Sequence, residues 1–166
     1  MSGIDPIVLV LRWIHLASAI VAIGGAAFSL FVLIPGVKKT LDESTHQRLR
    51  EAVRARWAPI VHPCIALLLL TGFINFFLLV IFPKVPAIPY HAVFGPKLLL
   101  ALFIFFVAEA LVGRAPGFAK MREAREKWLK ILLVAAAVVV LLSGVLNQIR
   151  SQHLKQGASA PSVTKS

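Results

Sequence analysis

The chain contains a single cysteine, Cys64, and only two methionines, Met1 and Met121. A lone cysteine excludes a disulfide within the chain and any Cys-x-x-Cys motif. Copper(I) favours thiolate and thioether ligands, and neither methionine falls in an apolar run, so a copper ion would depend on histidine alone. The sequence also lacks a phosphate-binding glycine loop, a Gly-x-Ser-x-Gly motif and a His-Glu-x-x-His motif. These absences argue against the common soluble enzyme classes.

Acidic residues are also scarce, because 7 Asp and Glu residues stand against 18 Lys and Arg residues, for a formal net charge of +11. In a soluble protein such a charge would suggest nucleic-acid binding. Here, however, twelve of the 18 basic residues lie in or beside two connections between apolar runs: Lys38, Lys39, Arg48, Arg50, Arg54, Arg56, Arg114, Lys120, Arg122, Arg125, Lys127 and Lys130. In a four-span protein these connections share one side of the membrane, which the positive-inside rule makes cytoplasmic. We therefore expect both termini outside, contact with membrane lipid and no nucleic-acid partner.

Four long apolar runs fill most of the chain, which is 58% hydrophobic. They cover approximately residues 7–34, 59–82, 92–112 and 128–149. Each is long enough to cross a hydrocarbon layer of about 30 Å at about 1.5 Å per helical residue. The sequence predicts an all-α integral membrane protein, an antiparallel four-helix bundle of four transmembrane helices formed by residues 1–150. Residues 151–166 are expected to form a polar, disordered tail.

Proline and glycine mark the expected ends of the spans. Pro35 and Gly36 predict a stop after the first span, and Pro59 suits the first turn of the second. The mixed-charge segment 40–57 has helical periodicity and predicts a short helix leading into the second span. Gly24 and Gly25 would let a neighbouring helix or a flat ligand approach the first span.

Ionisable side chains inside the apolar runs are the functional candidates, because lipid tolerates such groups only when they are paired, solvated or bound. Counted at about 1.5 Å per residue, His15, Asn75 and Lys97 lie about 9–12 Å from the outer surface. Three helices thus contribute polar groups to one layer. His62 and Glu109 form a second layer about 5–8 Å from the inner surface.

Each candidate also has a simpler interpretation. His15 and His62 would each serve only to hydrogen-bond a neighbouring helix. Lys97 would extend its long side chain to the surface. Arg12 would hold a lipid phosphate, and His91 would cap the third helix. Agreement in depth across separate helices favours a shared binding site over these independent roles.

Haem b in a helical bundle requires an imidazole ligand, small residues beside the macrocycle and cations near its propionates. His15 is the predicted axial ligand, and Arg12 lies one turn away on the side where a propionate would point. Lys97 and His91 are candidates for the sixth ligand or for contact with a substrate. His62 differs in depth from His15 by about 12 Å in a core of about 30 Å, which argues against both binding one iron. His62 is predicted instead to carry protons or to hold a second haem.

Three short motifs resemble a known family: RWIHL at residues 12–16, RARW at 54–57, and YH at 90–91 followed by GPKLL at 95–99. Together they resemble the copper-resistance D (CopD) type membrane domain, which is similar to the HemJ-type protoporphyrinogen oxidases. The resemblance covers about residues 8–146. It implies that His15 matches the haem-ligating first-span histidine and that Lys97 matches the third-span lysine. HemJ-like chains place a histidine very close before that lysine, whereas His91 precedes Lys97 by six positions, and His62 has no clear counterpart.

The sequence therefore predicts a b-type haem protein of the bacterial inner membrane. It would pass electrons between a membrane-soluble partner, such as quinone or a porphyrin, and another donor or acceptor. A second copy of the chain or a partner redox protein is a further expected partner. Two alternatives stay open: a copper-uptake or copper-tolerance protein with His15, His91 and His62 as metal ligands, and a structural or assembly subunit whose polar residues only join helices.

Overall fold

The computed structural model describes residues 6–40, 42–77 and 87–158, and within these ranges it contains helices and no strand. The chain forms four long helical segments, the first of which is interrupted by a π-helical turn. The elements are α1 (Pro6–Phe28), the π-helix η1 (Ser29–Leu33), α2 (Ile34–Thr40), α3 (Glu43–Phe76), α4 (Ala87–Val112), the 3-10 turn η3 (Pro116–Phe118), α5 (Ala119–Glu123) and α6 (Arg125–Ala158).

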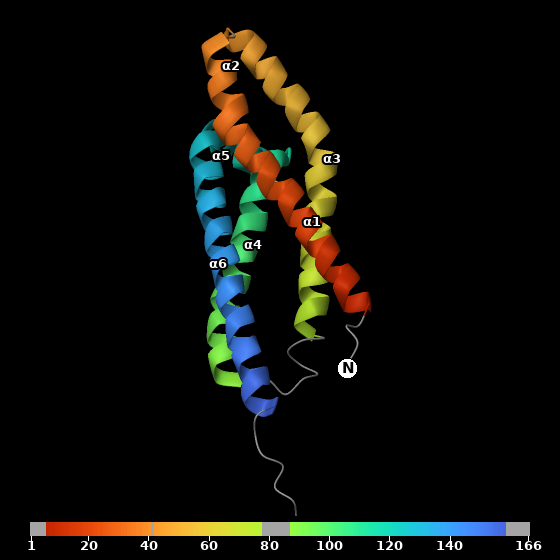
Figure 1. Cartoon of the computed structure of the whole chain (residues 1–166). Coiled ribbons are helices and arrows are strands. Elements are labelled where there is room, and N and C mark those ends of the chain that lie inside the picture. The colour runs from red at the N-terminus through yellow and green to blue at the C-terminus, as the bar shows by residue number, and fades with distance from the viewer. Residues whose placement is uncertain (1–5, 41, 78–86, 159–166) are drawn as a thin grey trace, which may run out of the picture.

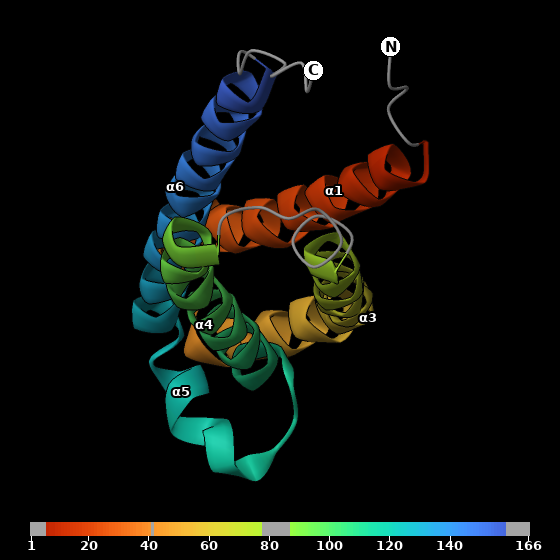
Figure 2. The same cartoon turned by 90° about the horizontal axis from the view of Figure 1, so that it is seen from below.

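The long helices run antiparallel and pack as two hairpins (Figure 1). α1 packs mainly on α3, and α4 packs mainly on α6. Viewed along the bundle, the α1–α3 pair and the α4–α6 pair lie side by side (Figure 2). We call the end where α2 meets α3 and α5 meets α6 the basic end, and the end where α1 begins and α6 finishes the terminal end.

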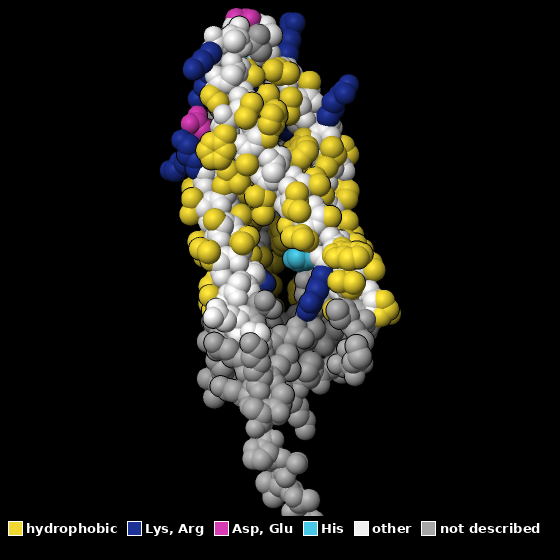
Figure 3. Space-filling model, viewed as in Figure 1, with side chains coloured by type: hydrophobic (Ala, Val, Ile, Leu, Met, Phe, Trp, Pro, Cys, Tyr) yellow, Lys and Arg dark blue, Asp and Glu magenta, His cyan; other side chains and the backbone are white. Residues whose placement is uncertain are grey.

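Within the described ranges, four segments are long and apolar enough to cross a membrane: Pro6–Thr40, Glu43–Asn75, Phe94–Val112 and Arg125–Leu146. Their outward faces carry large apolar side chains, and Leu141 is 70% exposed. Such side chains are spread over much of the described part of the face in Figure 3. Apolar surface of this extent suits lipid, and helices satisfy their own backbone hydrogen bonds there. The prediction of an all-α four-helix membrane bundle is confirmed.

The buried apolar core lies toward the basic end. One cluster joins the first segment to α4 and α6 and consists of Ala26, Leu30, Val107, Leu111, Leu129 and Leu132. A second cluster joins α3 to α4 and consists of Val61, Ile65 and Val112. Toward the terminal end, Figure 3 shows a hollow between the helices, with a histidine and basic side chains at its edge. The two hairpins are therefore joined by a buried apolar core near the basic end and pack less closely toward the terminal end.

Two predicted helix boundaries are wrong. The first segment does not stop at Pro35, because η1 leads directly into α2, which ends at Thr40. In η1 the amide of Ile34 bonds to the carbonyl of Ser29, five residues back. A proline ring clashes with the carbonyl four residues before it, and a π-helical turn just before Pro35 rearranges the carbonyls that would clash.

Pro59 does not begin a span either, because α3 is one helix that already starts at Glu43. The short helix predicted for residues 40–57 and the second span are therefore continuous. The Asp42 carboxylate accepts a hydrogen bond from the Thr45 amide at 3.2 Å and caps the start of α3. The expected domain boundary at residue 150 falls inside α6, which continues to Ala158, and residues 159–166 lie outside the described ranges.

Candidate functional site

His15 is held against α3 by a hydrogen bond. Its Nδ1 lies 2.8 Å from Oγ1 of Thr71, a residue that is only 2% exposed. A Cβ added at Gly72 would lie 3.6 Å from Cε1 of His15, so the ring lies beside the α3 backbone at this glycine. Ser18, one turn along α1 from His15, is buried. Because residues three apart share a helix face, His15 occupies the inward face of α1.

Thr71 determines which nitrogen of His15 carries the proton. The Thr71 hydroxyl donates to the backbone carbonyl of Leu67, with an oxygen–oxygen distance of 2.5 Å. A hydroxyl has one hydrogen, so toward His15 the Thr71 oxygen acts as an acceptor and Nδ1 donates. The neutral imidazole then has its lone pair on Nε2. Metal-binding histidines are oriented in this way, by a hydrogen bond from the nitrogen that does not bind the metal.

Two further polar side chains lie near this hydrogen bond. The Lys97 side chain lies on the side of α4 that faces the His15 region. Lys97 precedes Ile104 by seven residues, and Ile104 packs against the buried core, so both lie on nearly the same face of α4. On α3, Oδ1 of Asn75, one turn beyond Thr71, is buried with no hydrogen-bond partner in the described part of the chain. Polar groups of three helices therefore share one level of the terminal-end half.

The small residues of α1 do not provide the free surface expected for a macrocycle. The indole of Trp57 lies directly against Gly25, where an added Cβ would overlap the ring. Gly24 is exposed, and a Cβ added there would meet nothing within 4 Å. Of the two neighbours expected at Gly25, a helix or a flat ligand, the structure has the helix, because Trp57 of α3 occupies that surface. A ligand beside His15 would therefore have to lie on the terminal-end side of Gly25.

Arg12 and His91 are the remaining residues predicted for the outer layer. Arg12 is exposed on α1, one turn toward the terminal end from His15. The backbone of His91 belongs to α4, but its side chain lies outside the described residues. Its role as a ligand stays a prediction.

His62 belongs to a different part of the bundle. Its Nε2 lies 3.1 Å from Oε2 of Glu109, and both side chains are about half exposed (47% and 46%). His62 precedes Thr71 by nine residues, a separation of about 13 Å along the helix. Because Thr71 contacts His15, the two histidines are too far apart to bind the same metal ion. The His62–Glu109 contact joins α3 to α4.

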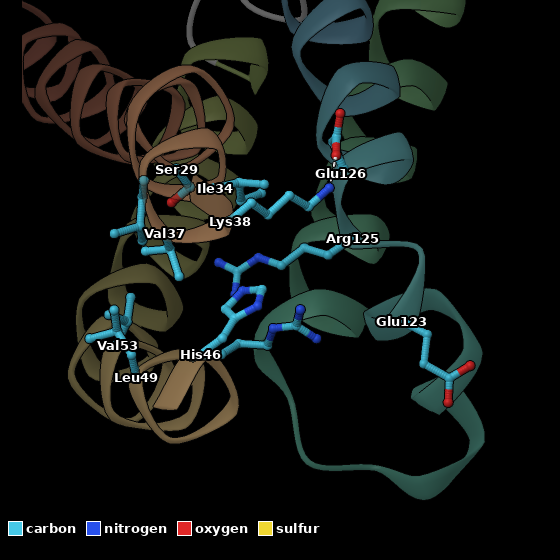
Figure 4. A pocket seen from close by; sticks show the side chains of 12 residues that line it. Ser29, Ile34, Val37, Lys38, His46, Leu49, Val53, Glu123, Arg125 and Glu126 are labelled. Carbon is cyan, nitrogen blue, oxygen red and sulfur yellow. Dashed lines mark hydrogen bonds and ion pairs between the residues drawn. The ribbon is translucent and has the colours of Figure 1, made fainter. Parts of the chain in front are cut away.

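The basic end contains a network of charged side chains. Glu126 pairs with both Lys38, at 2.8 Å, and Lys130, at 3.0 Å. Figure 4 shows Lys38 reaching Glu126, and Arg125 extending from the start of α6 toward His46 of α3. The side chains in this view surround a cavity of about 80 Å³. Sequence reasoning treated these basic residues only as topology signals.

Within the described ranges, no three His, Cys, Asp or Glu side chains come together as a metal site. A haem iron needs only one or two protein ligands, so the His15 arrangement has a sufficient donor set for haem. A copper site built from several histidines is not assembled by these residues. Cys64 is half-buried and free.

Sequence reasoning missed Thr71, although a signal was present. A threonine in the middle of an apolar run, one turn from an asparagine, is a candidate for hydrogen bonding between membrane helices. The helical register also puts Thr71 on the same face of α3 as the buried residues Ile65 and Leu68. What the sequence alone does not give is the pairing of α1 with α3 at this level.

Comparison of the chain with protein-family models, with curated proteins and with solved structures gave no significant match.

Proposed function

We propose that this protein is a b-type haem-binding membrane protein in which Nε2 of His15 is an axial ligand. The observation that carries the proposal is the hydrogen bond from Nδ1 of His15 to Thr71. With Nδ1 donating to Thr71, the inward-facing imidazole has Nε2 available to bind a metal. A histidine that only joined α1 to α3 would make the same bond, but a cationic residue beside it would serve no purpose there. Lys97 lies in a membrane-spanning segment, where its ammonium has a cost in lipid that a bound anionic guest would offset.

Residues around His15 would supply partners for the haem propionates and a second ligand for the iron. Arg12 is exposed one turn toward the terminal end and would pair with a propionate. Lys97 would provide the sixth ligand or a second propionate partner, and His91 is the alternative sixth ligand. Thr71 would keep the imidazole oriented and raise its basicity as a ligand.

When bound, haem supplies a one-electron couple at its iron. We propose that the chain uses it in the bacterial inner membrane to pass electrons between a quinone or porphyrin in the lipid and a partner redox protein. The His62–Glu109 pair, nearer the basic end, would accept or release the accompanying protons.

Two other functions remain as outcomes of the test. A copper-uptake or copper-tolerance protein would use His15 and His62 separately, because they are too far apart for one ion. A structural or assembly subunit would use the polar residues only to join helices, as the His62–Glu109 contact does.

An absorption spectrum of the protein purified in mild detergent tests the proposal. We expect a Soret band that shifts on dithionite reduction and a pyridine haemochrome typical of haem b. His15→Ala should abolish the band. Thr71→Val removes the acceptor for Nδ1 and keeps the side-chain shape, so it should weaken haem binding by about 10–100-fold. Thr71→Ser keeps the hydroxyl and should bind haem about as tightly as the wild type.

His46→Ala is the matched control, because His46 lies on α3 at the basic end, far from His15. It should leave the spectrum unchanged. Circular dichroism and size-exclusion chromatography of each variant will separate loss of haem from loss of fold. Colourless wild-type protein that binds Cu(I) would favour the copper function, and colourless protein that binds neither would leave the structural one.

A further inference from the structure

Four arginines converge at the basic end from three separate helices. Arg50 and Arg54 come from α3, Arg122 from α5, and Arg125 is the first residue of α6. All four line one cavity of about 280 Å³, whose walls also carry the carboxylates Glu43 and Glu51. The cavity therefore has four cationic side chains and two anionic ones around it.

These arginines are not paired with carboxylates of the protein. Among the described residues, none of the four forms an ion pair, although Glu43 and Glu51 line the same cavity. Glu126 is taken by Lys38 and Lys130, and Glu43 lies 3.9 Å from His46. Arg122 donates to the backbone carbonyl of Ala115 at 2.8 Å.

Arg125 provides an independent sign of a missing partner. Its Nε is buried and has no hydrogen-bond partner within the described part of the chain. Arg50 and Arg54 both act on it electrostatically. A buried guanidinium donor without an acceptor is costly, and like charges gathered around it add to that cost. A bound anion with several acceptor oxygens would remove both costs.

We propose that this cavity binds a phosphate group, and that its source is the headgroup of an anionic phospholipid. The planar guanidinium group of arginine can donate two parallel hydrogen bonds to the oxygens of one phosphate. Arg125 is also the first residue of a segment apolar enough to span a membrane, Arg125–Leu146, and a span that begins there would place Arg125 at headgroup level. Basic pockets between transmembrane helices bind phospholipid headgroups in this way. The lipid would contact α3 of one hairpin and α5 and α6 of the other, and would thus connect the two hairpins.

The test uses the full chain in detergent, with phosphatidylglycerol added and retention measured by native mass spectrometry and by the shift in melting temperature. We expect phosphatidylglycerol to be retained and to raise Tm, with zwitterionic phosphatidylcholine much weaker. The double variant Arg50→Gln/Arg54→Gln should weaken retention by about tenfold or more, because each arginine–phosphate contact is a charge-assisted hydrogen bond.

Arg48→Gln/Arg56→Gln is the matched control, because these arginines are exposed on the same helix and do not line the cavity. It makes the same change in charge and should retain the lipid. Without lipid, Arg50→Gln/Arg54→Gln should have an unchanged or higher Tm, since it removes repulsion around Arg125. A purely structural role for these arginines would instead lower the lipid-free Tm.

Inorganic phosphate and glycerol 3-phosphate form a second arm. If they raise Tm in the wild type but not in Arg50→Gln/Arg54→Gln, and phosphatidylglycerol is not retained, the lipid source is overturned and a soluble phosphate compound takes its place. If both double variants lose lipid equally, or no phosphate compound binds, the proposal of a phosphate site is overturned.

Discussion

The two halves of the bundle differ in the side chains that fill the space between the helices. Toward the basic end, apolar side chains from α1, α4 and α6 form a continuous core, in which Val107 is fully buried. Toward the terminal end, the inward faces carry His15, Thr71 and Asn75, and the space-filling view shows a hollow (Figure 3). A core made only to hold four helices together would continue the apolar packing through both halves. The contrast favours a stabilising role for the apolar core near the basic end, and it agrees with the haem site proposed for the terminal-end half.

The first prediction tests whether the core toward the basic end holds the two hairpins together. Leu111→Ala in α4 should lower the free energy of unfolding by about 2–5 kcal/mol, because Leu111 is 4% exposed and its loss leaves a cavity. Leu99→Ala is the control on the same helix, where the side chain is 69% exposed. It should cost much less than Leu111→Ala. Reversible unfolding in mixed micelles measures both, and equal losses would contradict the division into two halves.

The second prediction concerns the contact between α1 and α3. Gly25→Ala should destabilise the protein by about 1–3 kcal/mol, because the added methyl group overlaps the Trp57 indole and the ring or the helix must move. Gly24→Ala should be neutral or stabilising by up to about 1 kcal/mol, since nothing lies near its added Cβ and alanine favours helix. The two neighbouring substitutions thus differ in sign, and the same unfolding assay measures them. A destabilising Gly24→Ala would mean that another surface covers α1.

Much of the fold could be predicted from the sequence, because apolar runs long enough for a bilayer leave few alternatives to helices. The helix ends were harder to predict. Pro35 and Pro59 look like boundaries in sequence, but a π-helical turn and a continuous α3 accommodate them. Local rules describe what proline disfavours, while packing of neighbouring helices decides whether the helix continues.

The candidate site, like the fold, could be predicted only in part. Depth counting put His15 and Lys97 at one level, since helical rise is constant. It did not reveal Thr71 as the partner of His15, nor Trp57 as the cover of Gly25, because both depend on the rotation of α3 against α1. The arginines of the cavity come from three helices separated by turns, and only the folded chain brings them together.

The smallest expected effect comes from the connection at the basic end, where Asp42 caps α3. Hydrogen bonds from Ser44 and Thr45 lower the pKa of the Asp42 carboxyl well below its usual value. Because the folded pKa is the lower one, the ionised carboxylate stabilises the folded chain above the unfolded pKa of about 3.9, and this stabilisation is lost as the pH falls through the folded pKa.

Asp42→Asn keeps an acceptor at the cap but removes the charge. It should therefore reduce hydrogen-exchange protection of the Thr45 amide slightly at neutral pH and leave the rest of the bundle unchanged. The difference from wild type should shrink below about pH 4, when the wild-type carboxylate begins to lose its advantage. A change that reaches the His15–Thr71 contact would show that α3 couples the two halves, and would contradict their independence.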